Sequence, residues 1–255
     1  MTHHTLSRGT AAALLAAILA SLAGCSASGG RTNIDDDLSK TCPASAGLTT
    51  EIAIDGSGSD RSNEIRTVNL AVIADETRKT ALCGGHLRVF GFASSTGQTV
   101  AFYDGDLNAS APTANAHFRK ADKLAQQVEA QIESRYDAAL NELRGTGSDI
   151  FGMLALLQQA AEQSPADTLN GVVLSDGLQN IGFDPTSAAS EASASAMADA
   201  ADVPNLSGAS LTIVGIGRQA EGELPSTTIQ NVTAFWKRVC QRTKAATCSV
   251  STDWR

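Results

Sequence analysis

The sequence predicts an α/β fold: a doubly wound, mostly parallel sheet with one antiparallel edge strand, flanked by helices. Three observations predict it. Short apolar runs alternate with longer stretches of helical periodicity, which is typical of strands and helices in alternation. The apolar runs are continuous, as expected of parallel strands that are buried on both faces. One pair of runs is separated only by SSTG, which predicts a hairpin and therefore one antiparallel strand.

The first predicted elements are a strand, a helix and a second strand. Residues 50–55 are expected to form the first strand because three apolar residues follow one another there. Apolar residues then recur at helical spacing from Ile65 to Ile73, which places a helix at about 61–81. The run HLRVFGFA, residues 86–93, is expected to be the second strand.

A hairpin and two helices are predicted next. QTVAFY, residues 98–103, follows the SSTG turn and is expected to be the antiparallel edge strand. The long stretch 113–143 carries an apolar stripe from Leu124 to Leu140, which predicts a helix packed on the sheet. The loop GTGSD leads into a further helix, expected at 150–163.

The last third of the chain repeats the alternation. GVVLSDG, residues 171–177, is a continuous apolar strand that ends in Ser, Asp and Gly. Residues 184–204 are rich in Ala and Ser and are expected to form a weakly amphipathic helix with loops. SLTIVGIG, residues 210–217, is predicted to be the last strand, and a helix at 228–243 is expected to close the fold.

Composition limits the classes of partner. The 255 residues are 42% hydrophobic but only 4% aromatic, so the core is expected to be aliphatic. The formal net charge is −8, and no cluster of Lys and Arg interrupts the acidity, so nucleic acid is not expected as a partner. An acidic surface also repels anionic lipid headgroups, so membrane attachment would need something other than charge.

The N-terminus predicts a lipid anchor. Arg8 precedes an apolar stretch, Ala11–Ala20, which is too short to span a bilayer and suits the core of a signal peptide. The stretch ends in LAGC, which resembles the lipobox of bacterial lipoproteins, where the cysteine, here Cys25, is lipidated; an ordinary secretory signal is the alternative. The resemblance implies a location in the cell envelope, on the outer face of the cytoplasmic membrane or facing the periplasm. The expected segments are a signal peptide at 1–24, a flexible tether at 25–46 and one domain at 47–255.

Oxygen-bearing side chains gather where two predicted strands end. The first strand is followed by Asp55-Gly56-Ser57-Gly58-Ser59, and the strand at 171–177 carries Asp176. In a parallel sheet such ends meet at one rim, where ligands bind. Carboxylates and hydroxyls without imidazole or thiolate favour hard cations such as Mg2+ or Mn2+. The alternative interpretation is a tight turn in which Ser and Asp cap the next helix.

The DGSGS stretch resembles the D-x-S-x-S motif of von Willebrand factor type A domains, and is very close to its form in integrin inserted domains. This motif belongs to the metal-ion-dependent adhesion site of that family. The resemblance extends over about 50–243 in the order of the elements. VVLSDG places Asp176 where the family has an aspartate from its third loop.

The second loop departs from the family pattern. The family usually has G-T-x-I/T before a helix, whereas this chain has Gly147-Ser148-Asp149-Ile150. Alignment of the helix start places Ser148 at the threonine position, and Thr146 is the competitor if the loop is longer.

Transferred residue by residue, the resemblance implies a role for each side chain. The hydroxyls of Ser57, Ser59 and Ser148 would touch the metal, while Asp55 and Asp176 would act through water or orient the hydroxyls. An acidic side chain of a protein partner would fill the remaining position. Asp60 and Asp149 match no ligand position, so they are expected to orient the ligands or to be solvated.

The resemblance implies a binding function without catalysis, that is, metal-dependent adhesion or envelope assembly with no catalytic residue. One alternative is a metal-assisted hydrolase or phosphatase that uses Asp55 and Asp176. Another is an assembly factor whose metal is purely structural. Neither His86 nor His117 is expected at the rim, and no G-x-S-x-G or phosphate-binding loop occurs.

Four cysteines remain once Cys25 is assigned to lipid, and an even number in an exported chain predicts two disulfides. Three pairings are possible. In the fold of the family that the chain resembles, all four would lie at the rim opposite the metal. That arrangement favours Cys42–Cys83 and Cys240–Cys248 and leaves crossed pairings open.

Overall fold

The computed structural model describes residue 42 and residues 47–165, 168–222 and 224–254. The expected signal peptide, the lipidation site Cys25 and nearly all of the expected tether lie outside these residues. None of the helices in the part of the chain that is described combines the length and the apolar character needed to cross a membrane.

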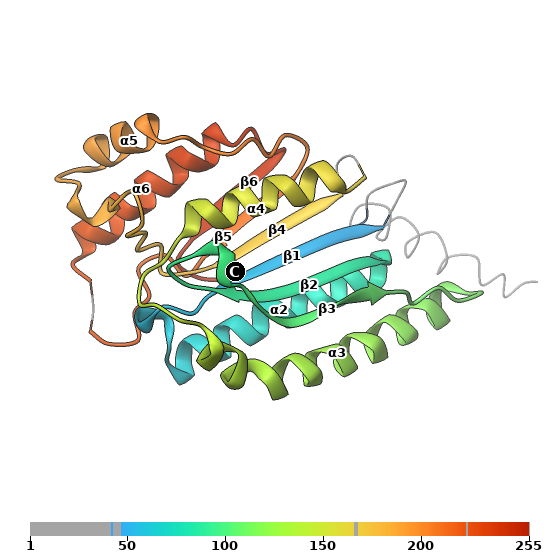
Figure 1. Cartoon of the computed structure of the whole chain (residues 1–255). Coiled ribbons are helices and arrows are strands. Elements are labelled where there is room, and N and C mark those ends of the chain that lie inside the picture. Colours follow the sequence, from blue (N-terminus) through green and yellow to red (C-terminus); the bar gives the residue numbers. More distant parts are fainter. Residues whose placement is uncertain (1–41, 43–46, 166–167, 223, 255) are drawn as a thin grey trace, which may run out of the picture.

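One six-stranded sheet forms the centre of the domain, in the order β3-β2-β1-β4-β5-β6 (Figure 1). Strands β1, β2, β4, β5 and β6 pair in parallel, and β3 is the antiparallel edge strand. The predicted fold class is therefore confirmed. The strands are β1 Leu48–Asp55, β2 Gly85–Phe92, β3 Val100–Leu107, β4 Leu169–Leu174, β5 Ser210–Val214 and β6 Thr247–Ser251.

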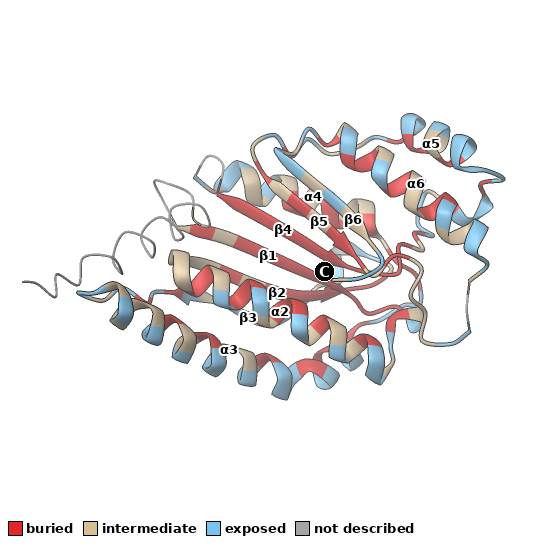
Figure 2. Cartoon of the chain, turned by 180° about the vertical axis from the view of Figure 1, so that it is seen from behind, coloured by how far each residue is buried: buried red, intermediate tan, exposed pale blue. Residues whose placement is uncertain are grey.

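Helices cover both faces of the sheet. Helices α2 and α3 lie on one face, while α4 and α6 lie on the other, with α5 packed against α6 (Figure 1). The central strands are almost wholly buried between these layers (Figure 2). This burial on two sides explains why their sequences are continuous apolar runs. The helices are α2 Asn63–Cys83, α3 Ala114–Glu142, α4 Ile150–Gln163, α5 Glu191–Ala200 and α6 Ser226–Arg242.

Alternate residues of a strand belong to the two hydrophobic cores on opposite faces of the sheet. Ile52 and Ile54 of β1 point to the core under α2 and α3, and Ala53 between them belongs to the core under α4 and α6. The apolar stripe of α3 packs on the sheet as predicted, with Ile132 and Tyr136 at 0% and 1% exposure. The long helix is thereby fixed to the sheet along its length.

The C-terminal end differs from the prediction. The sequence predicted helix 228–243 as the last element, but the chain continues into strand β6 beyond α6. This strand is short and polar, so its composition gave no apolar run. It pairs with β5 over five residues, from Ser210↔Thr247 to Val214↔Ser251.

Both favoured disulfides are present. Cys42 and Cys83 have their Cα atoms 5.2 Å apart, and Cys240 and Cys248 have theirs 5.8 Å apart. The first joins the chain ahead of β1 to the end of α2, and the second joins the last turn of α6 to β6. The crossed pairings are therefore excluded.

Candidate metal centre

The strand order reverses beside β1. From β1 the chain moves to β2 on one side, and it later crosses to β4 on the other side of β1. In sheets of this kind, ligands usually bind at the carboxyl ends of the strands beside such a reversal, which here are β1 and β4. Asp55 is the last residue of β1, and Ser175 and Asp176 directly follow β4.

Asp55 organises the first loop. One carboxylate oxygen accepts the backbone N–H of Ser57 at 2.9 Å, and the other accepts the Ser175 hydroxyl at 2.7 Å. The turn passes close to the end of α3, because a Cβ atom at Gly56 would collide with Leu143. Glycine at this position therefore lets the loop pack tightly, and the carboxylate of Asp55 is held by its own loop and by the residue that follows β4.

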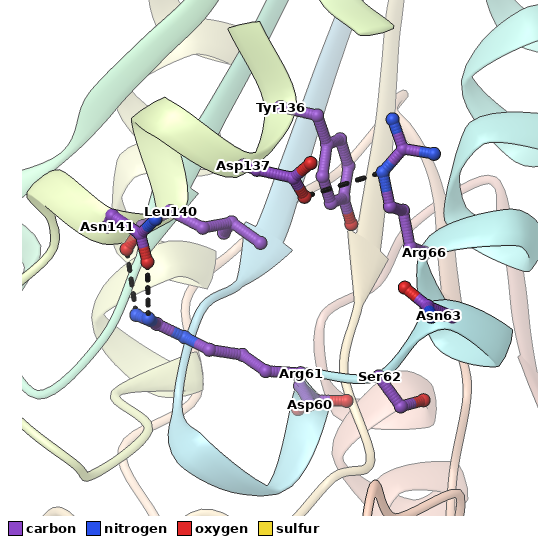
Figure 3. A pocket seen from close by; sticks show the side chains of 9 residues that line it. All are labelled: Asp60, Arg61, Ser62, Asn63, Arg66, Tyr136, Asp137, Leu140 and Asn141. Atoms are coloured by element: carbon purple, nitrogen blue, oxygen red, sulfur yellow. Dashed lines mark hydrogen bonds and ion pairs between the residues drawn. The ribbon is translucent and has the colours of Figure 1, made fainter.

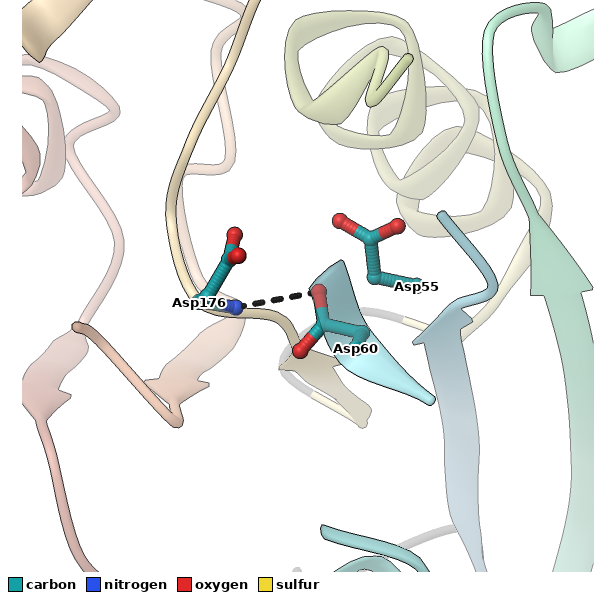
Figure 4. A group of neighbouring side chains, drawn as sticks. All are labelled: Asp55, Asp60 and Asp176. Atoms are coloured by element: carbon teal, nitrogen blue, oxygen red, sulfur yellow. Dashed lines mark hydrogen bonds between the residues drawn. The ribbon is translucent and has the colours of Figure 1, made fainter. Parts of the chain in front are cut away.

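Three buried carboxylates converge at this point. Asp55, Asp60 and Asp176 each offer an oxygen within 4.8 Å of the others, and they are 0%, 6% and 0% exposed (Figure 4). Asp60 accepts the backbone N–H of Asp176 at 3.3 Å, and Asp176 Oδ1 accepts the N–H of Leu178 at 2.9 Å. Asp176 Oδ2 is buried and has no hydrogen-bond partner. A buried carboxylate oxygen without a partner is costly, so a cation at this point would relieve it.

The electrostatics of the cluster favour a positive guest. Burial raises the pKa of Asp55 above its usual range, against the effect of its hydrogen bonds. Burial and the charges of Asp55 and Asp176 raise the pKa of Asp60 well above its usual value. Burial, together with the charge of Asp55, raises the pKa of Asp176 to about 6. No Lys, Arg or His among the described residues forms an ion pair with these carboxylates.

The predicted hydroxyls lie against the same carboxylates. The hydroxyls of Ser57 and Ser59 are 3.2 Å apart. Ser59 also lies beside Asp176 and lowers the pKa of that carboxyl, which partly offsets the effect of burial. The structure thus brings together all five residues that the sequence proposed as metal ligands: Asp55, Ser57, Ser59, Ser148 and Asp176.

The second loop presents Ser148 instead of Thr146. Ser148 is 1% exposed, and its side chain lies beside Asp55 and lowers the pKa of that carboxyl, whereas Thr146 is exposed to solvent. The backbone N–H of Ser148 donates to Asn180 Oδ1 at 3.0 Å, and Ser94 Oγ accepts the N–H of Gly147 at 2.8 Å. These two side chains hold the loop in the register that points Ser148 inward.

Several site residues were not found from the sequence. Asp60 was expected to orient ligands or to be solvated; it is buried within the cluster, so the solvated reading is wrong. Asp149 instead caps α4, accepting the N–H of Gly152 at 3.0 Å. Gln179 Oε1 accepts the N–H groups of Ile150 at 2.7 Å and Phe151 at 3.2 Å, so the loop after β4 also fixes the start of α4. The polar residues Gln179 and Asn180, shortly after Asp176, were the available indication in the sequence that this loop contributes to the site.

The donor set fits a hard divalent cation. Three carboxylates and three hydroxyls supply only oxygen, the ligand that Mg2+, Mn2+ and Ca2+ prefer. The unpartnered Asp176 Oδ2 agrees with this fit, and so does the lack of an ion pair to the three carboxylates among the described residues. A bound divalent cation would offset two of the three negative charges of the cluster and could accept one more ligand from outside.

Neither a scan against models of protein families nor a search of curated proteins found a match. Function is therefore inferred from the geometry of the centre and from the residues themselves.

Proposed function

We propose that the chain is a protein-binding domain of the von Willebrand factor A type, which binds its partner through a divalent cation. The observation that carries the proposal is the buried Asp176 Oδ2, without a hydrogen-bond partner, inside a cluster of three carboxylates at the strand switch point. Mg2+ or Mn2+ would be held by Asp55, Asp60 and Asp176 with the serine hydroxyls around them. The cation, when bound, supplies a coordination position that an acidic side chain of a partner can fill.

The position of the described histidines favours binding over hydrolysis. His86 lies in β2, at the end of the sheet opposite the cluster, and His117 contacts the backbone oxygen of Leu82 at 2.7 Å. Neither is available to activate water beside Asp55 or Asp176. A metal-assisted hydrolase would therefore depend on the cation to activate water, or on a carboxylate of the cluster as base or nucleophile.

Asp60 changes the expected affinity for the cation. The motif resemblance implied two carboxylates and three neutral hydroxyls, a set that binds Mg2+ weakly without a further anion. A third buried carboxylate adds attraction at short range in a poorly solvated site. We therefore expect the isolated domain to retain its cation, and the partner to bind the loaded form.

The attachment to a membrane is part of the same proposal and rests on the sequence around Cys25. Acylation of this cysteine would display the domain in the cell envelope on a polar tether. Cell fractionation of the full chain tests it: wild type is expected with the membranes, and Cys25→Ser in the soluble fraction. Membrane recovery of Cys25→Ser equal to that of wild type would refute the lipid anchor.

Calorimetric titration with Mg2+ and Mn2+ tests the cation site. Asp55→Ala and Asp176→Ala are each expected to weaken binding by about 100-fold or more, because each removes a charged oxygen ligand. Ser57→Ala should weaken it less. Asp202→Ala removes an exposed carboxylate elsewhere and is the matched control. Unchanged cation affinity in both aspartate variants would refute the site.

Partner binding is tested by pull-down from solubilised cell envelopes, with Mg2+ and with EDTA. A partner that bridges the cation is expected to be lost in EDTA and in Asp55→Ala, and retained by Asp202→Ala. Equal recovery with and without the cation would mean that the metal is structural only.

A further inference from the structure

A pocket of about 420 Å³ lies next to the cation site, between the start of α2 and the end of α3 (Figure 3). Asp60 belongs both to the carboxylate cluster and to the wall of this pocket. Helix α2 begins directly after the first metal loop, and α3 ends directly before the second. The pocket therefore flanks the site on the rim where a partner would bind. Its other walls are formed by Arg61, Ser62, Asn63, Arg66, Tyr136, Asp137, Leu140 and Asn141.

Two donor groups in this pocket carry a proton that forms no hydrogen bond. Tyr136 accepts a hydrogen bond from Asn69 at 3.0 Å, so its own proton remains available. Burial raises the pKa of Tyr136 to about 12, and the phenol therefore keeps this proton at neutral pH. Arg66 Nε is buried and makes no hydrogen bond. Figure 3 shows the phenol oxygen directed into the space beside Arg66.

The ion pairs of Arg66 are easily replaced. Its nearest carboxylate, Asp137, is 3.4 Å from Nε, and Glu133 is 3.7 Å from a terminal nitrogen. Both carboxylates are well exposed, at 73% and 61%, so water screens their attraction. Exposed ion pairs of this kind contribute little to stability. A carboxylate delivered by a docked partner could therefore take Arg66 Nε at little cost.

The charge of the pocket depends on the cation. Without a cation, Asp60 and Asp137 balance Arg61 and Arg66. The charge of Asp60 also acts on Tyr136, which shows that the phenol and the cluster are electrostatic neighbours. A bound divalent cation would offset two of the three negative charges of the cluster, so that less negative charge faces the two arginines. The pocket would then repel an incoming anion less than it does without the cation.

We propose that this pocket binds a second carboxylate of the same partner, through the Tyr136 hydroxyl and Arg66 Nε, beside the carboxylate that reaches the cation. The inference rests on the proposed function, because it assumes a partner carboxylate at the metal. It specifies the partner further, as a segment with two acidic residues close together in its sequence. One of them binds the cation, and the other binds in the pocket.

Synthetic peptides test this assignment. One peptide carries a single Asp among glycines, and a series carries two Asp separated by one to four glycines. Binding to the full domain is measured in Mg2+ and in EDTA by fluorescence anisotropy. The best two-acid peptide is expected to bind about tenfold more tightly than the single-acid peptide, the effect of one charge-assisted hydrogen-bonded pair. Any gain beyond twofold exceeds the statistical advantage of two identical acids.

Four variants locate the gain. Tyr136→Phe and Arg66→Gln should each reduce the two-acid peptide to the affinity of the single-acid peptide. Asn69→Ala removes the Asn69–Tyr136 hydrogen bond but keeps the phenol. Arg135→Gln removes an exposed charge from α3, the helix that carries Tyr136. Both controls should keep the gain. Melting temperatures compare the folding of all four variants.

The outcomes separate the two proposals. The inference is overturned if no spacer length makes the two-acid peptide bind more than twofold more tightly than the single-acid peptide. It is also overturned if the gain in affinity persists in both Tyr136→Phe and Arg66→Gln. Either result leaves metal-dependent binding intact. Absence of Mg2+-dependent binding for every peptide overturns the proposed function together with this inference.

Discussion

The two ends of the sheet treat acidic side chains in opposite ways. At the carboxyl end, Asp55, Asp60 and Asp176 gather without an ion-pair partner among the described residues. Toward the amino end, carboxylates face cations across the strands. His86 lies 2.8 Å from Asp106 and 2.9 Å from Asp104.

Burial makes this contrast informative. The paired carboxylates of β3 are largely exposed, at 55% for Asp104 and 86% for Asp106, so their partners are a modest addition to hydration. The three unpaired carboxylates are buried, where an uncompensated charge is expensive. The exposed carboxylates Asp104 and Asp106 thus have cationic partners, whereas the three buried carboxylates of the cluster have none among the described residues. This contrast supports the proposal that the carboxyl end of the sheet binds a cation.

The largest expected effect comes from the amino end. Replacing Cys42 and Cys83 by Ser should lower the free energy of unfolding by about 4 kcal/mol, because the disulfide closes a long loop of the unfolded chain. The sequence separation is 41 residues. Cation affinity should stay within about twofold, since the disulfide lies opposite the site. Urea unfolding and calorimetry measure the two quantities, and a parallel loss of both would show that the ends are coupled.

The second prediction concerns the loop before α4. Ser148→Ala should weaken Mg2+ binding about tenfold, or about 1.4 kcal/mol, because a hydroxyl that lies against Asp55 is lost. Thr146→Ala is the matched control and should have no measurable effect, because Thr146 is exposed. Titration calorimetry distinguishes them. The reverse ranking would mean that the loop shifts its register when it binds the cation.

The third prediction compares one substitution at each end. In EDTA, Asp60→Asn should raise the free energy of unfolding by about 1 kcal/mol, because it removes one of three crowded, buried charges. It should also weaken cation binding. Asp104→Asn should lower stability slightly, because it removes a partner of His86. Thermal unfolding in EDTA and in Mg2+ tests the pair, and a strong loss of stability for Asp60→Asn in EDTA would contradict the contrast between the ends.

Much of this architecture could be predicted from the sequence. Continuous apolar runs located four of the five parallel strands, because burial on both faces removes polar residues from a parallel strand. The short SSTG connection located the antiparallel strand β3. The DGSGS run and Asp176 located the first and third loops, since their oxygen side chains follow such runs directly. Helix α2 shows where the pattern weakens. Its buried face includes Asn69 and Glu76, and Glu76 accepts a hydrogen bond from Asn170 at 2.7 Å.

Asp60 could not be found in this way, because a linear pattern does not distinguish a buried carboxylate from an exposed one. Its burial depends on the 3-10 turn Gly58–Asp60, in which the N–H of Asp60 bonds the backbone oxygen of Ser57 at 3.2 Å. This turn rotates the side chain inward, toward the backbone N–H of Asp176. The contact joins residues 116 positions apart, and only the assembled sheet brings them together.

The smallest expected effect tests whether the amino end stabilises through charge at all. Burial alone would lower the pKa of His86, but hydrogen bonds and charges of Asp106 and Asp104 raise it above its ordinary value. The protonated ring is therefore favoured by folding. Its contribution is fully present below the unfolded value, about pH 6.5, and is lost as the pH rises through the folded value.

His86→Gln should accordingly lower the free energy of unfolding by less than about 1 kcal/mol near pH 5.5, since the ring is partly exposed and screened. Near pH 9 the difference from wild type should disappear, because both carboxylates then face a neutral ring. Urea unfolding of the two proteins across this range measures it, and the difference between them cancels the titration of other groups. A loss that is equal at both pH values would assign the effect to packing, and the amino end would then owe nothing to its paired charges.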